Sequence, residues 1–248
     1  MDLICLAQLY RHFIRPGLPI HLFNVIGQQN CKRKFCANGG RLMSTYTSGY
    51  KPWFKIGDNG GQWDISRQDS GLNEIDFKGK TVLEIGCAEG LVALQNLKRG
   101  ASLSHGIEFR ERAVEVARSI AGVLGLSNIA KFYWGDIRDT RRVLNQPGML
   151  EKYDIVIAMA VLQKVPNQSE VLGKILEKCA TTLVLRLPLR ELYKYRLFRW
   201  RYSWGVVDPV EVARKNGFRL VWESCGYPQG KPPFPKTGEA WLGVFERA

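Results

Sequence analysis

Hydrophobic positions from Lys80 onward follow two alternating patterns. Short runs rich in Val, Ile and Leu, such as Thr81–Ile85 and Tyr153–Met159, are typical of buried strands. Between such runs, apolar residues recur every three or four positions, as the leucines of 91–97 do, which is typical of a helix. Strands and helices in alternation predict a parallel sheet whose strands are joined by crossover helices.

The patterns predict an α/β fold with a doubly wound sheet of about seven strands and helices on both faces. The expected strands are 81–85, 103–108, 131–134, 153–159, 181–187, 219–224 and 240–246, and the expected helices are 91–99, 113–124, 171–178 and 209–216. The last two strands flank a Gly- and Pro-rich connection that is long enough to reverse direction. The sheet is therefore expected to be mostly parallel, with an antiparallel last strand.

Charge divides the chain into two regions. From Leu3 to Gly57 there is no Asp or Glu against eight Lys and Arg. We therefore expect a basic N-terminal extension or cap over 1–57 and the main domain over 58–248. An acid-poor start could also be an organelle transit peptide, although Asp2 and the scarcity of serine favour a cap.

Composition narrows the class of protein. Hydrophobic residues make up 45% and charged residues 24%, as in globular proteins, and no apolar run reaches membrane-spanning length. The net charge of +13 indicates either attraction to an anionic partner or solubility alone. Six scattered cysteines favour a reduced compartment, and we predict the cytoplasm, with an organelle as the alternative. Cys31 and Cys36 form a single pair, so no metal site is predicted.

The segment "VLEIGCAEGL" ends the first predicted strand with an acid and a glycine turn. A dinucleotide-binding turn would have the spacing G-x-G-x-x-G, but from Gly86 its second and third glycines fall on Ala88 and Leu91. The spacing present is acid-x-Gly-x-x-x-Gly, formed by Glu84, Gly86 and Gly90.

This spacing resembles motif I of the class I S-adenosylmethionine-dependent methyltransferases, and the resemblance extends from Lys80 to Ala248. Glu108 ends the second strand in "HGIEF", where the family places an acid for the ribose hydroxyls, and Asp136 in "WGDI" matches its acid for the adenine amino group. "YDIVIAMAVLQKV" resembles the fourth-strand motif beside the reaction site. The resemblance implies a Rossmann-like fold and S-adenosylmethionine as cofactor.

The residues expected at the cofactor follow from these matches. They are Glu84, Gly86, Cys87, Ala88, Gly90, Glu108, Phe109, Asp136, Ile137 and Ala158. Simpler interpretations exist for some of them: Glu108 as an ordinary strand-end acid, Asp136 as a helix N-cap, and Cys87 as a small filler of the turn. Ala88 departs from the family, which commonly has glycine there.

The acceptor side is less well marked. Methyl transfer needs alignment and exclusion of water, and needs a base only if the nucleophile must lose a proton. In "AVLQKVPN", Gln163 and Lys164 stand where related small-molecule and tRNA methyltransferases have His-His, so they are the catalytic candidates, although Lys164 could simply be a solvated helix-start lysine. The sequence lacks the Asn-Pro-Pro-Tyr signature of many nucleic-acid amino methyltransferases.

A basic and aromatic insertion is predicted at 186–204, with six Lys or Arg and six aromatic residues. Helical spacing would place Tyr193 and Trp200 on an apolar stripe with Arg190 and Lys194 beside it, and these four are the expected substrate contacts. We interpret the insertion as a lid, with a nucleic-acid or anionic-membrane surface as alternatives.

The sequence therefore predicts an S-adenosylmethionine-dependent methyltransferase acting on an anionic small molecule or tRNA. The alternatives are an aminopropyltransferase, or a non-catalytic RNA- or membrane-binding protein that retains the fold.

Overall fold

Two compact parts, Met1–Asp64 and Ile65–Ala248, make up the 248-residue chain. The structure, a computed structural model, describes residues 54–55, 63–64, 72, 74–188, 208–225 and 240–248. In the first part, strands β1 (Phe54–Lys55) and β2 (Trp63–Asp64) pair in parallel. Most of the predicted 186–204 insertion lies outside the described residues.

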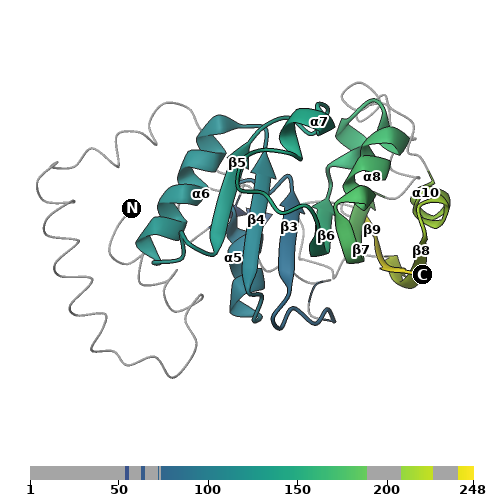
Figure 1. Ribbon diagram of the computed structural model, residues 1–248, viewed down its shortest axis with the longest axis horizontal. Helices are drawn as coiled ribbons and strands as arrows, with labels where there is room; N and C mark the ends of the chain where they lie inside the picture. Colours follow the sequence, from purple (N-terminus) through teal and green to yellow (C-terminus); the bar gives the residue numbers. More distant parts are fainter. Residues whose placement is uncertain (1–53, 56–62, 65–71, 73, 189–207, 226–239) are drawn as a thin grey trace, which may run out of the picture. The chain divides into compact units, whose positions relative to one another are not determined.

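The second part contains a seven-stranded sheet in the order β5-β4-β3-β6-β7-β9-β8 (Figure 1). Strands β3 to β7 are parallel, whereas β9 runs antiparallel to both of its neighbours. This arrangement confirms the predicted Rossmann-like fold class. The strands are β3 (Thr81–Ile85), β4 (Leu103–Glu108), β5 (Ala130–Trp134), β6 (Tyr153–Met159), β7 (Cys179–Pro188), β8 (Phe218–Cys225) and β9 (Ala240–Arg247).

Helices cover both faces of the sheet. Successive strand residues point to opposite faces, so both faces carry apolar side chains against which helices pack. Leu83 and Ile85 of β3 join a buried cluster with α8 and α10, whereas Phe132 of β5 lies on the opposite face near α5 and α6. The helical segments are α5 (Leu91–Lys98), α6 (Glu111–Val123), α7 (Thr140–Val143), the 3-10 turn η3 (Leu162–Lys164), α8 (Gln168–Glu177) and α10 (Pro209–Lys215).

The predicted boundaries need small corrections. Helix α8 spans Gln168–Glu177 rather than 171–178, because Asn167 and Lys178 occupy its cap positions. Strand β7 continues to Pro188, so Arg186, the first residue of the predicted insertion, belongs to the sheet. The four-residue helix α7 was not predicted, since it is too short to show helical periodicity.

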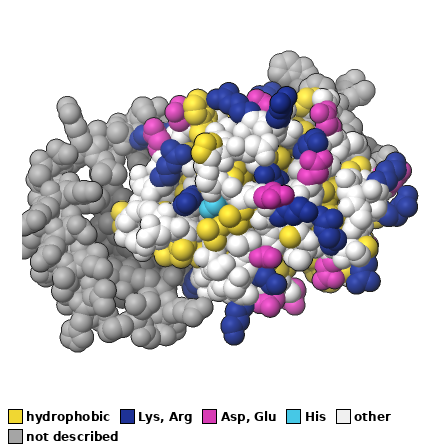
Figure 2. All heavy atoms as spheres, viewed as in Figure 1, with side chains coloured by type: hydrophobic (Ala, Val, Ile, Leu, Met, Phe, Trp, Pro, Cys, Tyr) yellow, Lys and Arg dark blue, Asp and Glu magenta, His cyan; other side chains and the backbone are white. Residues whose placement is uncertain are grey.

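The surface of the described residues carries mixed charge. Basic and acidic side chains are interspersed on the face shown in Figure 2. Most of the excess of Lys and Arg over Asp and Glu falls in segments that the structure does not describe. In the described part of the chain, no helix is long and apolar enough to cross a membrane.

Candidate functional site

The strand order reverses between β3 and β6. The chain passes from β3 through β4 to β5 on one side and places β6 and β7 on the other. In open parallel sheets, ligands bind beyond the carboxyl ends of the strands at such a switch point. The ends of β3, β4 and β6 therefore define the candidate site.

The turn after β3 is held in a conformation that favours glycine. Gly86, Ala88 and Gly90 all have positive φ, at 76°, 48° and 75°. The N–H groups of Gly86 and Cys87 both donate to the Ile107 carbonyl, at 2.8 and 3.0 Å, which fixes the turn to β4. Ala88 adopts a backbone conformation that costs a non-glycine residue about 1–3 kcal/mol, so the surrounding structure must enforce it.

The turn also lies tightly against the segment after β6. A Cβ atom added to Gly86 would come within 2.5 Å of Val161 Cγ2, well inside van der Waals contact. Ala160, just before Val161, has φ of 57°. Two strained alanines, Ala88 and Ala160, thus flank the switch point.

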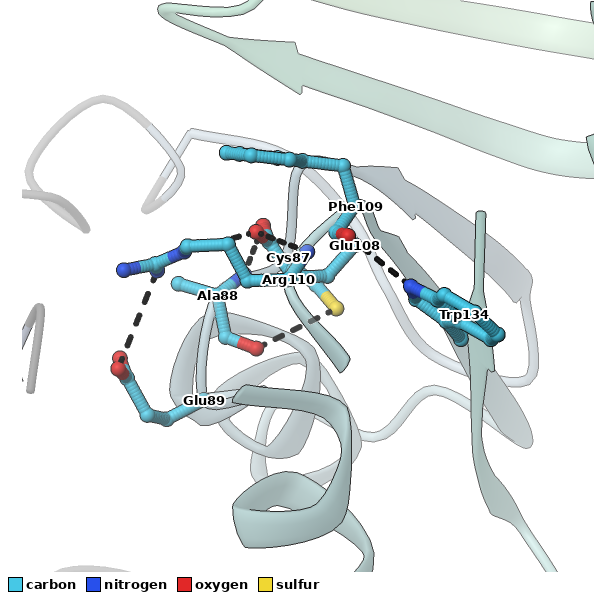
Figure 3. Close-up of polar contacts among 7 residues, drawn as sticks. All are labelled: Cys87, Ala88, Glu89, Glu108, Phe109, Arg110 and Trp134. Atoms are coloured by element: carbon cyan, nitrogen blue, oxygen red, sulfur yellow. Dashed lines mark hydrogen bonds and ion pairs between the residues drawn. The ribbon is translucent and has the colours of Figure 1, made fainter. Parts of the chain in front are cut away.

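The Glu108 carboxylate closes the turn from β4 (Figure 3). It is 4% exposed, and its Oε2 accepts a hydrogen bond from the Ala88 N–H at 3.1 Å. Its Oε1 accepts from the Arg110 N–H at 3.1 Å and from Arg110 Nε at 3.0 Å. Sequence reasoning predicted Glu108 as the acid that ends the second strand, and the structure places its carboxylate against the backbone of this turn.

Three buried carboxylates surround the turn: Glu84, Glu89 and Glu108 are 3%, 2% and 4% exposed. Burial, followed by the negative charges of Glu84 and Glu108, raises the pKa of the Cys87 thiol well above its usual range. The Cys87 thiol therefore stays protonated beside these acids.

Arg110 bridges two of these acids and was missed from the sequence. Its guanidinium bonds Glu108 and reaches toward Glu89 (Figure 3), with Nη2 4.0 Å from Glu89 Oε1. Arg110 is the N-cap residue of α6, a position that favours Ser, Thr, Asp or Asn and disfavours positive charge. The sequence did carry a signal for this role: an arginine at the N-cap position of α6, two residues after Glu108.

Asp136 lies in the loop after β5. Its Oδ1 accepts from the Arg138 N–H at 2.9 Å and its Oδ2 from Arg138 Nε at 2.8 Å, and this pairing lowers the pKa of Asp136. The N-cap of α7 is Asp139, whose side chain accepts from the Arg142 N–H. The interpretation of Asp136 as a helix N-cap is therefore wrong.

Two exposed aromatic residues lie beside this loop. Phe109 is 60% exposed and Trp134 is 50% exposed, and Trp134 Nε1 donates to the Phe109 carbonyl at 3.0 Å. Large exposed aromatic surfaces at the ends of adjacent strands suit a flat ring. Trp134 was not among the predicted site residues.

Other predicted residues present no side chain to this site. Cys87 is fully buried, and a Cβ added to Gly106 would meet its sulfur at 2.6 Å, so Cys87 fills the space above β4. Ile137 and Ala158 are buried members of the core cluster. The predicted substrate contacts Arg190, Tyr193, Lys194 and Trp200 lie outside the described residues.

Gln163 and Lys164 occupy η3, directly after β6. Gln163 is 6% exposed and its side-chain carbonyl has no hydrogen-bond partner. Part of Lys164 reaches solvent, but burial of its ammonium group, with the nearby charges of Arg110 and Arg186, lowers its pKa, while Glu108 acts in the opposite direction. Within the described ranges, no group of three His, Cys, Asp or Glu side chains could hold a metal ion.

Comparison with known proteins identifies the fold. A family model described as a methyltransferase domain matches residues 76–186, which contain the turn, Glu108, Asp136 and η3. This segment therefore matches a methyltransferase domain. The prediction of the family is confirmed, and the cofactor of this family is S-adenosylmethionine.

One curated relative is the ubiquinone biosynthesis O-methyltransferase of Neisseria meningitidis, 28% identical over 141 residues. The match covers 56% of this chain and 57% of that enzyme, so the chain spans little more than half the length of this relative.

Solved structures show the same fold. The methyltransferase domain resembles magnesium protoporphyrin IX methyltransferase from Synechocystis PCC 6803 with bound SAH, at a TM-score of 0.52 and 16% identity, over 100% of this chain and 96% of that one. It also resembles the 4+2 cyclase SpnF, at a TM-score of 0.56 and 15% identity, over 74% of this chain and 79% of that one. Since a cyclase shares the fold, the fold alone does not specify the reaction.

Proposed function

We propose that the chain transfers a methyl group from S-adenosylmethionine to an acceptor bound beyond β6 and β7. The observation that carries this proposal is the left-handed turn at Gly86–Gly90 facing the buried Glu108 carboxylate at the switch point of the sheet. The turn suits the cofactor because its positive-φ backbone lies beside the Glu108 carboxylate, whose Oε2 accepts one hydrogen bond and can accept another from a hydroxyl.

Glu108 is proposed to hold the ribose hydroxyls. A carboxylate offers about four lone-pair positions, two on each oxygen. Arg110 already donates twice to Oε1, whereas Oε2 accepts once, from Ala88. For both ribose hydroxyls to bond separate oxygens, the Arg110 side chain has to move off Oε1, while its backbone N–H can stay.

The adenine end is proposed to lie between Phe109 and the Asp136 loop. The exposed ring of Phe109 offers a stacking surface, and Asp136 can accept a hydrogen bond from an amino group. The low pKa of Asp136 keeps this carboxylate ionised and therefore able to accept. Ile137 packs beneath the loop and supports it.

The cofactor supplies an electrophilic methyl group on sulfur and leaves as a neutral thioether. The protein's part is then to align the acceptor and exclude water. Gln163 can orient an acceptor through its carbonyl but cannot remove a proton, because an amide does not ionise. We therefore propose that Gln163 orients the acceptor, and that Lys164, whose pKa burial lowers, is the candidate base for an acceptor that must lose a proton.

The acceptor is proposed to be an anionic small molecule or tRNA. The net charge of +13 supports an anionic partner. A relative named for O-methylation in ubiquinone biosynthesis supports a small molecule. We place the activity in the cytoplasm, supported by the two buried free thiols, Cys87 and Cys179.

Calorimetry with S-adenosylmethionine tests the cofactor site. We expect Glu108→Ala to weaken binding by about tenfold or more, because a charged hydrogen-bond acceptor is lost. Glu115→Ala is the matched control, since Glu115 is exposed on α6 and pairs with Arg112. If the wild-type chain fails to bind the cofactor, the proposed function is wrong.

Acceptor identity calls for a second experiment. Incubation of the full chain with methyl-labelled cofactor and fractionated cell extract should place label in small molecules or in tRNA. Label confined to protein, or no transfer by a chain that binds the cofactor, would contradict the proposed acceptor.

A further inference from the structure

A recess of about 320 Å³ opens at the outer edge of β5. Strand β5 is the last strand on its side of the sheet, and α6 packs beside it (Figure 1). The recess is lined by Ala130 and Lys131, the first residues of β5, and by none of the residues proposed to hold the cofactor. Its volume lies at the lower end of the range of small-molecule sites, about 300–1,000 Å³.

Side chains already cover the outer edge of β5. Arg118 Nε and Nη2 donate to the Phe132 carbonyl at 3.0 and 2.7 Å, and Gln146 Nε2 donates to the Trp134 carbonyl at 3.1 Å. A peptide that extended the sheet would need these carbonyls to accept its own N–H groups. The recess is therefore better suited to a small molecule than to an added strand.

Two cations at the recess have no carboxylate partner. Arg118 and Lys131 both line it and are exposed, and neither pairs with an Asp or Glu in the part of the chain that the structure describes. By contrast, Arg112 on the same helix pairs with Glu115 at 2.6 Å. Arg118 has five N–H groups and uses two of them at the Phe132 carbonyl, so it can donate further. No Asp or Glu lines the recess, so its charge is positive.

The floor of the recess is apolar except for one hydroxyl. Ala121 and Phe132 are buried and line it. Tyr133 also lines it and is 8% exposed, and its hydroxyl has no hydrogen-bond partner among the described residues. This hydroxyl lies beside Gly148, another lining residue, where an added Cβ would be 3.4 Å from it. Burial raises the pKa of Tyr133 against the opposing charge of Arg118, so the hydroxyl stays protonated and can donate.

We propose that this recess binds a small organic anion, with an apolar body against the floor and a carboxylate or phosphate held by Arg118, Lys131 and the Tyr133 hydroxyl. The three donors come from α6 and β5 and line one cavity. Hydrogen bonds from cations to an ionised group are stronger than those between neutral groups, so the anionic group decides which ligand binds. The site is separate from the cofactor turn and does not depend on the proposed methyl transfer.

Calorimetry on the full chain, with and without S-adenosylhomocysteine, tests the recess. The probes are benzoate, phenyl phosphate and the neutral analogue benzamide, so that the two anions distinguish a carboxylate from a phosphate. We expect at least one anion to bind at least about tenfold more tightly than benzamide. S-adenosylhomocysteine should change that affinity by less than about twofold, because the two sites share no residue.

Variants assign the binding to these residues. Lys131→Met, Arg118→Met and Tyr133→Phe are each expected to weaken the anion by about tenfold, because each removes a donor to a charged group. Arg112→Met is the matched control, since Arg112 lies on α6 and already pairs with Glu115. If Arg118→Met does not fold, Lys131→Met and Tyr133→Phe carry the test, because Lys131 is exposed and the Tyr133 hydroxyl bonds no described residue.

Several outcomes would overturn the site. Equal binding of all three probes, or none, would do so, as would anion binding that Lys131→Met or Tyr133→Phe leaves unchanged. Loss of anion binding on addition of S-adenosylhomocysteine would place the anion in the cofactor site instead. Binding of a glutamate-rich peptide, but of neither anion, that is lost in Lys131→Met would replace the small molecule with a peptide. Failure to bind S-adenosylhomocysteine refutes the proposed function alone, because the anion and its variants are measured without it.

Discussion

Gly86 offers a direct test of how tightly the cofactor turn is packed. An alanine at this position would have φ near 76°, and its Cβ would lie 2.5 Å from Val161 Cγ2. The left-handed backbone costs about 1 kcal/mol, and relief of the overlap with Val161 costs about 1–3 kcal/mol more. We therefore expect Gly86→Ala to lower the free energy of unfolding by about 2–4 kcal/mol.

Gly79 is the matched control for backbone strain. Its φ of 71° is nearly the same, but a Cβ added there would meet nothing within 4 Å, so Gly79→Ala should cost about 1 kcal/mol. Removing Val161 Cγ2 should abolish the extra cost, because the next nearest atom, Val161 Cβ, is at 3.9 Å. In a Val161→Ala background, Gly86→Ala should therefore cost no more than Gly79→Ala.

Urea unfolding followed by circular dichroism measures all four proteins of this double-mutant cycle and the control. The expected coupling between Gly86→Ala and Val161→Ala is about 1–3 kcal/mol, the part of the cost due to overlap. If Gly86→Ala costs the same in both backgrounds, Val161 does not press on the turn, and the reasoning fails.

Three further predictions concern the stability of the domain. Tyr153→Phe should lower the free energy of unfolding by about 1–3 kcal/mol, because the buried hydroxyl accepts from the Leu150 N–H and shares a 2.7 Å hydrogen bond with His105 Nδ1. Tyr133→Phe is the control: it removes a hydroxyl without a partner and should change the free energy of unfolding by about 0.5 kcal/mol at most. A larger loss in Tyr133→Phe than in Tyr153→Phe would refute the assignment. Burial lowers the pKa of His105 from 6.5 to about 4, below its value in the unfolded chain. The free energy of unfolding should therefore be highest above pH 6.5 and fall by about 3 kcal/mol as the pH drops from 6.5 through 4. Urea unfolding across this range should show the decline, and His105→Gln should abolish it. Asp208→Ala should cost about 1 kcal/mol in thermal or urea unfolding, since the carboxylate caps α10, and an unchanged stability would show that the cap contributes nothing.

Patterns confined to a few adjacent residues predicted much of the fold. The ends of β3, β4 and β6 match the predicted strands. The apolar run of β3 stops at Gly86 and β4 ends in the acid Glu108. The strand order depends on which strands pair across the sheet, and the periodicity of a single strand does not encode that pairing. The prediction of a doubly wound sheet therefore rested on the alternation of strands with helices and on the family resemblance.

Sequence reasoning could place those site residues whose position depends on a single strand. Glu108 could be placed because it is the last residue of β4, and Asp136 because it follows β5 by two residues. The pairing of Arg110 with Glu89 could not, because it joins residues 21 positions apart through a turn whose conformation the sequence does not specify.

Departures from local preference gather at this one end of the sheet. Ala88 and Ala160 are the non-glycine residues with positive φ in the part of the chain that the structure describes, and both border the β3–β6 switch point. Arg110 places a positive charge at the start of α6, where the helix dipole opposes it, and two buried acids offset the cost. Strain and unfavourable charge persist only where the rest of the structure enforces them, and such places are where proteins bind and react. Because these costs arise in separate elements yet meet at one place, packing of any single element does not explain them, whereas a shared ligand site does.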